Sequence, residues 1–280
     1  MDIGGKRSEK DDRKKNKGKE KQIVEEEIAE EEMPRNRKYM DCPVNWDWRL
    51  YLGIISNVLT QKHHLICWAI AFIRSVEALF NIGKRLEDQK SFSIQHLINN
   101  IEIGSLGLKE STDLGKFVAE KGILEEAECS YTRAKDTCVH ENPKMERIDR
   151  LVVIKEVDDV DLARLVWKHP VVGVVPLWSD FESYKSGIYR PQKEINLQLH
   201  AILILGFGVD EHGNYYWIIQ NSGGRNWGEG GFGRLYRESR RGKLSTWSQN
   251  MELWCTLFGT TSLLQGLGTW CQRPDTTSIV

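Results

Sequence analysis

Residues 61–79 have the sequence QKHHLICWAIAFIRSVEAL, and this stretch decides the fold. Between residues 65 and 82 the apolar side chains recur at the three- and four-residue spacing of an amphipathic helix. The pattern therefore predicts a helix with Cys67 at its N-terminal end. Because the positive end of a helix dipole lowers the pKa of a thiol, this position favours a reactive thiolate.

Three further residues make Cys67 a candidate nucleophile. Gln61 precedes it, and His200 and Asn221 follow far downstream. In acyl transfer the cysteine attacks and the histidine holds the thiolate as an ion pair. The asparagine orients the imidazole, and the glutamine amide donates to the developing oxyanion. The structural alternatives are a buried core cysteine and a core histidine, since residues 201–204 after His200 are apolar.

Three segments that follow one another along the chain contain more specific sequence motifs. Residues 42–79 hold a Trp-Arg pair, Gln61 and a Cys-Trp-Ala step, and residues 180–189 have the sequence DFESYKSGIY. Residues 199–237 hold a His-Ala pair, a Gly-x-Gly turn and an Asn-Ser-x-Gly-x-x-Trp-Gly loop. Together these segments resemble the papain family of cysteine proteases, as a divergent member. The histidine follows the cysteine by about 130 residues, a spacing typical of that family.

The resemblance implies an α+β fold of two papain-like halves, with a helical first half, an antiparallel β second half and the active site in the cleft between them. The peptidase domain is expected over residues 41–237, with its halves at about 41–150 and 151–237. Catalytic roles are implied for Cys67, His200, Asn221 and Gln61. Contacts with substrate are implied for Leu65, Ile66, Leu199 and Trp227.

Periodicity and turn residues predict the elements of both halves. Helices are expected where apolar residues recur at helical spacing, and strands where β-branched or alternating apolar residues are bounded by turns. The expected helices are residues 93–101, with Ser93 as a cap, 114–121, closed by Gly122, and 162–169; the expected strands are residues 171–175, 201–208, 215–219 and 231–236, the middle two joined as a hairpin by the turn at 210–214.

Several positions depart from the family pattern around the cleft. The family has Cys-Gly-Ser before the nucleophile, and this chain has His64, Leu65 and Ile66 there. Leucine and isoleucine add bulk where a glycine would let the substrate backbone approach closely. The family's Gly-Gly pair is replaced near Leu108 and Lys109. These changes predict a narrowed cleft.

Gly223 replaces the tryptophan that follows the Asn-Ser pair in the family. That indole shields the bond between asparagine and histidine from water. Its loss is expected to expose the bond and weaken it, because exposure raises the effective dielectric constant. The charged machinery is therefore expected to be present beside an altered cleft.

The six cysteines do not fit the family's disulfide framework. His64 stands where the family has a cysteine, and residues 104–109 lack its partner. Cys129 and Cys138 are close in sequence, and Cys138 lies near a family cysteine position whose partner is missing. Two explanations stay open, a cytosolic derivative with reduced thiols and a degraded copy.

The charge and composition of the chain limit the kinds of partner and the class of protein that can be expected. The formal net charge of −1 gives no field that favours nucleic acid or an anionic membrane. No apolar run is long enough for a transmembrane helix. Residues 1–40 are rich in Lys, Arg, Asp and Glu and are predicted to be disordered. Residues 238–280 match no family segment and are predicted to be a divergent tail. No metal or cofactor is expected, since His63 and His64 have no further ligands at metal-site spacing.

The leading function is a cysteine-type endopeptidase, with polypeptide substrates and, by resemblance, cystatin-like inhibitors as partners. The chain is expected to be monomeric. One alternative is a weak or inactive papain-fold protein that binds a peptide or partner, and another is a truncated or mis-assembled copy. Location stays open: no apolar signal segment is visible, which favours the cytosol, whereas the family resemblance favours the vacuole, the lysosome or secretion.

Overall fold

The computed structural model describes residues 42–105, 107–138, 143–155, 157–191, 195–238, 251–257 and 277–279. The predicted disordered tail lies outside these residues, as does much of the predicted C-terminal tail. No helix among the described residues is long and apolar enough to cross a membrane.

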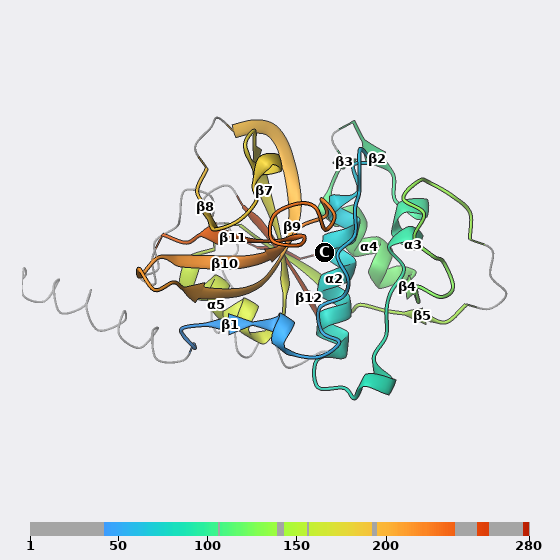
Figure 1. Cartoon of the computed structure of the whole chain (residues 1–280). Coiled ribbons are helices and arrows are strands. Elements are labelled where there is room, and N and C mark those ends of the chain that lie inside the picture. Colours follow the sequence, from blue (N-terminus) through green and yellow to red (C-terminus); the bar gives the residue numbers. More distant parts are fainter. Residues whose placement is uncertain are drawn as a thin grey trace, which may run out of the picture. The chain divides into compact units, whose positions relative to one another are not determined.

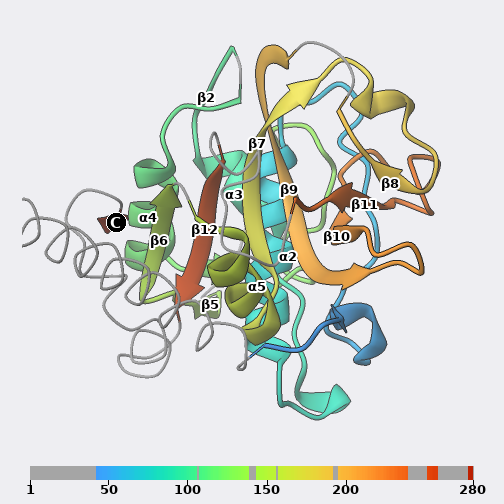
Figure 2. The ribbon, with the colours of Figure 1, turned by 90° about the vertical axis from the view of Figure 1, so that its left-hand side faces the viewer.

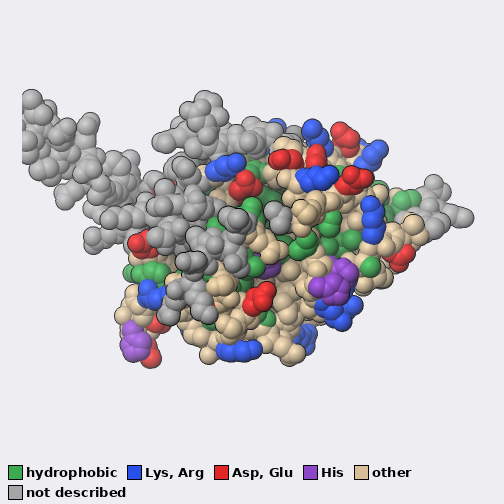
Figure 3. Space-filling view, turned by 90° about the horizontal axis from the view of Figure 1, so that it is seen from above, with side chains coloured by type: hydrophobic (Ala, Val, Ile, Leu, Met, Phe, Trp, Pro, Cys, Tyr) green, Lys and Arg blue, Asp and Glu red, His purple; other side chains and the backbone are tan. Residues whose placement is uncertain are grey.

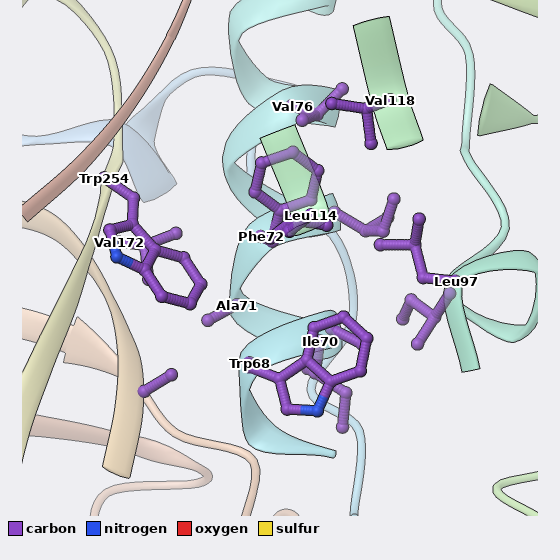
Figure 4. Packing of buried hydrophobic residues seen from close by; sticks show 14 of the residues in the cluster. Trp68, Ile70, Ala71, Phe72, Val76, Leu97, Leu114, Val118, Val172 and Trp254 are labelled. Atoms are coloured by element: carbon purple, nitrogen blue, oxygen red, sulfur yellow. The ribbon is translucent and has the colours of Figure 1, made fainter. Parts of the chain in front are cut away.

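The predicted central helix is confirmed as α2, Cys67–Asn81. Nearly every residue of α2 is buried, which identifies it as a core helix with apolar contacts on several sides. Figure 4 shows Phe72 and Val76 facing the neighbouring helices, while Ala71 lies toward Val172 and Trp254 of the sheet. The helix that begins at Cys67 is therefore fixed between the two halves of the molecule.

Two shorter helices pack beside α2, as the sequence predicts (Figure 1). In α3, Ile94–Asn100, the Ser93 hydroxyl accepts a hydrogen bond of 2.9 Å from the His96 N–H, which caps the first turn. In α4, Ser111–Glu120, the chain leaves the helix through Gly122 at a φ of +80°. A side chain there would meet the Glu146 carbonyl oxygen at 2.8 Å, so glycine is required.

The second half is built around one large sheet (Figure 2). Its strand order is β13-β6-β12-β7-β9-β10-β11-β8, with β1 also paired to β9. All of these pairs are antiparallel except β8 with β11. The strands are β1 (Trp46–Asp47), β6 (Arg150–Lys155), β7 (Val171–Trp178), β8 (Ile188–Tyr189), β9 (Ile195–Val209), β10 (Tyr215–Gln220), β11 (Phe232–Tyr236), β12 (Glu252–Leu257) and β13 (Thr277–Ile279).

Several smaller elements lie outside the sheet. In the part of the chain that the structure describes, these are two short two-stranded pairs and three single 3-10 turns that connect longer elements. They are β2 (Ile103–Gly104) with β3 (Gly107–Leu108), β4 (Ile123–Leu124) with β5 (Met145–Glu146), and the turns η1 (Trp48–Leu50), η2 (Leu86–Asp88) and η3 (Phe181–Ser183).

Helices cover both faces of the sheet (Figure 2). Val174 and Ala201 of the central strands join the core around α2. The helix α5, Asp159–Lys168, lies on the other face, where the sequence predicts a helix. Because both faces are covered, β7 and the second half of the hairpin strand β9 are apolar over long runs, and His200 lies at the start of the buried run in β9.

The sequence places residues 238–280 outside the peptidase domain, but the structure puts β12 inside the sheet, between β6 and β7. The first half, predicted to be mostly helical, also contributes a strand to this sheet, since β1 pairs with β9. Both strands are short, and their positions come from contacts with segments far away in the chain. Pairing of this kind cannot be predicted from the local sequence pattern of a strand.

A disulfide bond joins Cys129 to Cys138. The Asn99 side-chain amide lies 3.4 Å from the Cys138 sulfur, so an asparagine fills the space next to this bond. The explanation that all thiols are kept reduced does not hold for this pair. The partner of Cys138 is Cys129, a pairing that the sequence analysis left open.

Candidate active site

Cys67 lies at the first position of α2, on the wall of a cavity of about 490 Å³. Burial by itself raises the pKa of the Cys67 thiol. A hydrogen bond to His200, the charge of that imidazole, and backbone hydrogen bonds with Ala201 and Trp68 outweigh burial, so the pKa is lowered below its usual value. The site therefore favours a thiolate at Cys67.

His200 comes from β9, which runs beside α2, and it is 8% exposed. Burial acts to lower the pKa of its imidazole, but the hydrogen bond and charge of Cys67, with smaller effects of Asn221 and Glu182, raise the pKa above its usual value. The two shifts have opposite directions and a shared cause. Each group stabilises the charged form of the other, which is the behaviour of a thiolate–imidazolium pair.

Asn221 immediately follows β10 and fixes the histidine ring. Its Oδ1 lies 2.7 Å from His200 Nε2 and also accepts a hydrogen bond of 2.8 Å from the Ser222 N–H. Because the Ser222 N–H can only donate, this atom is the amide oxygen, and His200 Nε2 must carry a proton. The other ring nitrogen, Nδ1, is left for the thiol of Cys67.

Gln61 is held by the same loop. Its backbone N–H donates to the Ser222 carbonyl oxygen at 2.9 Å, and its Oε1 accepts a hydrogen bond of 3.0 Å from the Ser222 hydroxyl. With Oε1 occupied in this way, the Nε2 donors remain for the cavity, which Gln61 lines together with Cys67 and His200. These donors are suited to an oxyanion at the carbon that Cys67 attacks.

Aromatic side chains enclose the pair formed by His200 and Asn221. The Phe181 ring lies edge-on to the His200 ring, with centroids 6.0 Å apart. The Trp227 indole N–H donates to the Phe181 carbonyl oxygen at 2.9 Å, and the two rings pack with centroids 4.9 Å apart. These contacts keep water from one side of the imidazole.

The expectation that Gly223 exposes the bond between asparagine and histidine is wrong. Asn221 is only 6% exposed, and His200 is buried with it. A Cβ atom at Gly223 would lie 3.1 Å from the Trp227 Cβ, so the loop passes too close to Trp227 for a side chain to fit without a shift. Glycine here lets Trp227 pack against the loop, and the shielding is retained.

Three of the four residues expected to contact substrate line the cavity at Cys67, namely Leu65, Leu199 and Trp227. Ile66 does not. It is 3% exposed and packs in the core around α2, because its position directly before the helix turns its side chain inward. The bulk expected of Ile66 at the cleft wall is therefore absent.

A second cavity of about 420 Å³ adjoins the first. Cys67 and Leu199 line both, and Leu108 and Lys109, which replace the family's glycine pair, line the second. The Cys67 thiol thus lies between two open spaces. The predicted narrowing of the cleft does not close access to it.

The structure also assigns positions to residues that sequence reasoning missed. Ser222 orients Gln61, and Phe181 packs on His200. Ser222 follows Asn221 in the Asn-Ser loop, and Phe181 lies in the segment 180–189. Both residues therefore belong to motifs named above, but the motifs alone assigned neither residue a role. Among the described residues, no group of three or more His, Cys, Asp or Glu side chains is arranged to hold a metal ion.

Known proteins share this pattern. The model of the papain family cysteine proteases matches residues 42–251. Ananain from Ananas comosus is 30% identical over 198 residues, which cover 70% of this chain and 56% of that protein. A cysteine proteinase from Theileria annulata is 36% identical over 194 residues, covering 66% of this chain and 42% of that protein.

Solved structures agree with the sequence relatives. The structure of the bromelain protease from Ananas comosus in complex with the E64 inhibitor has a TM-score of 0.63 and 26% identity, and the match covers 78% of this chain and 100% of that chain. The chain spans about half the length of the first curated relatives that it matches. The α+β fold is the papain fold, and the chain belongs to the papain family of cysteine proteases.

Proposed function

We propose that this chain is a cysteine endopeptidase that hydrolyses peptide bonds through a Cys67 thiolate and a His200 imidazolium. The observation that carries the proposal is the hydrogen-bonded series from Cys67 through His200 to Asn221, with Gln61 on the wall of the same cavity. The opposed pKa shifts of the cysteine and the histidine are the electrostatic signature that this chemistry requires.

In the first step the thiolate sulfur of Cys67 forms a bond to the carbonyl carbon of the scissile peptide. The negative charge moves to the carbonyl oxygen, where the side-chain amide of Gln61 donates a hydrogen bond. The imidazolium of His200 gives its proton to the amine nitrogen as the bond between carbon and nitrogen breaks. The amine product leaves, and a thioester joins the acyl part to Cys67.

In the second step His200, now neutral, takes a proton from a water molecule that attacks the thioester carbon. The bond between carbon and sulfur breaks, the carboxylic acid leaves, and the proton on His200 restores the ion pair. The hydrogen bond from His200 Nε2 to Asn221 holds the ring in one orientation through both steps.

We further propose that the substrates are polypeptides in extended form, lying across the two cavities that meet at Cys67. Cystatin-like inhibitors and a monomeric state are proposed on the family resemblance. The disulfide between Cys129 and Cys138 supports an oxidising location, such as a vacuole or the extracellular space, over the cytosol. Microscopy of the tagged full chain, with trapping of free thiols, tests this location.

The activity is tested with a peptide-like epoxide that alkylates reactive thiols. Purified, folded protein should be labelled at Cys67, as mapped by peptide mass analysis, and should cleave an unstructured protein substrate. A Cys67→Ala variant with the same circular dichroism spectrum is the control and should do neither. Folded protein that binds peptides without labelling or turnover would instead support a binding module.

A further inference from the structure

A row of three basic side chains forms one rim of the cavity at Cys67. Lys62, His63 and His64 directly follow Gln61, and all three line this cavity. The two imidazole rings lie together, with centroids 4.4 Å apart. Figure 3 shows a group of histidine side chains on this face beside a basic one. We call these three residues the basic rim.

Lys62 has a backbone conformation that lysine seldom adopts. Its φ is +51°, in the left-handed region, although nothing in its side chain stabilises that region. A non-glycine residue is strained in this region, whereas glycine is not. Strained backbone of this kind clusters at active sites and ligand-binding sites, which makes Lys62 a candidate for a functional role.

The other charged side chains of this cavity leave the balance positive. Glu182, in the turn η3, and Lys185, just after it, line the same cavity as the basic rim. Glu182 is the only carboxylate among the described residues that line the cavity, and it also acts on His200. Two lysines face one glutamate before any histidine is protonated, and a cleft concentrates the field of its walls. An incoming group of negative charge is favoured there.

The reaction geometry tells which part of a substrate enters this cavity. His200 lines the first cavity and not the second, whereas Cys67 lines both. The group that leaves as an amine must lie against His200, because His200 protonates it. The residues that follow the scissile bond therefore extend over the first cavity and past the basic rim.

We infer that the basic rim selects substrates with an acidic side chain, Asp or Glu, within the first two residues after the scissile bond. This inference rests on the proposed peptidase function. It adds a specificity device formed by Lys62, His63 and His64, with Lys185 lining the same cavity.

The size of the preference for an acidic substrate residue can be estimated from the strength of ion pairs at the protein surface. An exposed ion pair changes a binding constant by up to about fivefold. Comparing an acidic with a basic substrate residue adds one attraction and removes one repulsion, so about a tenfold ratio is expected at low salt. The ratio should shrink at high salt, because the Debye length falls to a few ångströms.

The test uses the full chain and three internally quenched peptides that differ only in the two residues after the scissile bond, which are both Glu, both Gln or both Lys. The value of kcat/KM is measured for each peptide at low and at high salt. The expected order is Glu above Gln above Lys, with the ratio of Glu to Lys falling as salt rises. The same three pairs of residues placed on the acyl side should give no comparable order.

Two variants of equal net charge locate the effect. In Lys62→Glu the ratio of Glu to Lys should fall below one, whereas Lys116→Glu, on the exposed face of α4 and outside both cavities, should leave it unchanged. Taking a ratio within each variant removes any difference in the amount of folded protein. Lys62→Gly should lose the preference even though glycine suits the backbone at that position.

A substrate whose leaving group is a small fluorescent amine separates the two levels of the proposal, since it has no residue over the basic rim. No turnover of that substrate by folded protein overturns the proposed function itself. Turnover with equal kcat/KM for the Glu and Lys peptides, or an equal response of Lys62→Glu and Lys116→Glu, overturns the basic rim alone.

Discussion

Two parts of the cleft differ in how they are built. The reacting groups, Cys67 and His200, are held by buried hydrogen bonds and by helix and strand backbone. The basic rim, residues 62–64, lies in a turn, where Lys62 and His63 are exposed and His64 is half-buried. We propose that the first part sets the reaction and that the second sets the substrate preference.

The comparison teaches how a divergent chain keeps its chemistry. Two of the departures from the family pattern are accommodated by local packing, whereas Leu65, Leu108 and Lys109 still line the cavities. Ile66 turns into the core, and Gly223 lets Trp227 pack against the loop that follows Asn221. We call the reacting groups Cys67 and His200, with the residues that hold them, the buried set. We therefore expect substitutions of the buried set to remove activity, and substitutions on the cleft wall to change kcat/KM for particular substrates.

The largest effect is expected for Cys67→Ser. Serine has no pKa low enough for His200 to ionise it, so kcat/KM for a peptide should fall by at least about a thousandfold. Steady-state kinetics with a fluorogenic peptide measure this fall, and thermal melting of the variant shows that it is folded. Activity within tenfold of the wild type would contradict the role of the thiolate.

A smaller loss is expected for Gln61→Ala. Removing one oxyanion donor costs about a hundredfold to a thousandfold in kcat. KM should change little, because the hydrogen bond strengthens only as the oxyanion develops. Gln198→Ala is the matched control, since Gln198 lines the same cavity. Equal losses in the two variants would remove Gln61 from the reaction.

Asn221→Ala should reduce kcat/KM by about tenfold to a hundredfold, the range for a lost hydrogen bond to a charged group. Asn221 raises the pKa of His200, so its removal should move the alkaline limb of the pH profile to lower pH. Asn226→Ala, also on the cavity wall, should leave that limb in place. An unmoved limb in Asn221→Ala would mean that the residue has only a structural role.

The smallest effect is expected for Leu65→Ala on the cleft wall. Leu65 lines a cavity that is already open, so kcat/KM for a good substrate should change by no more than about fivefold. A gain far beyond this limit would show that Leu65 obstructs the cleft. The sequence-based expectation of a narrowed cleft would then hold for Leu65, and the contrast between the buried set and the wall would weaken.

Sequence patterns predict the part of the fold that local signals specify. The apolar spacing of α2, the cap at Ser93 and the hairpin turn before β10 each have a local physical cause, and each is found. The strand β12 was missed because its position between β6 and β7 depends on pairing across the whole chain.

The candidate site divides in the same way. The residue types at Gln61, Cys67 and Asn221 could be picked out from motif and spacing, and the structure brings them together. The orienting role of Ser222 and the packing of Gly223 against Trp227 could not be predicted, because they depend on distances of about 3 Å between loops. The shielding of the hydrogen bond between Asn221 and His200 was misjudged for the same reason.

We propose that Cys67 and His200 exist as a thiolate and an imidazolium. The pair is populated above the lowered pKa of the cysteine and below the raised pKa of the histidine. Acidification through the first pKa or alkalinisation through the second therefore destroys it. At a pH well below about 8.5, where an ordinary thiol is protonated, Cys67 should still be ionised.

The direct measurement is the rate of alkylation by iodoacetamide against pH, with the other thiols subtracted by means of Cys67→Ser. The account predicts that Cys67 reacts at a sustained rate well below pH 8.5. In folded His200→Ala, the rate should rise only near the pKa of an ordinary thiol. A wild-type profile that matches an ordinary thiol, unchanged in His200→Ala, would contradict the ion pair.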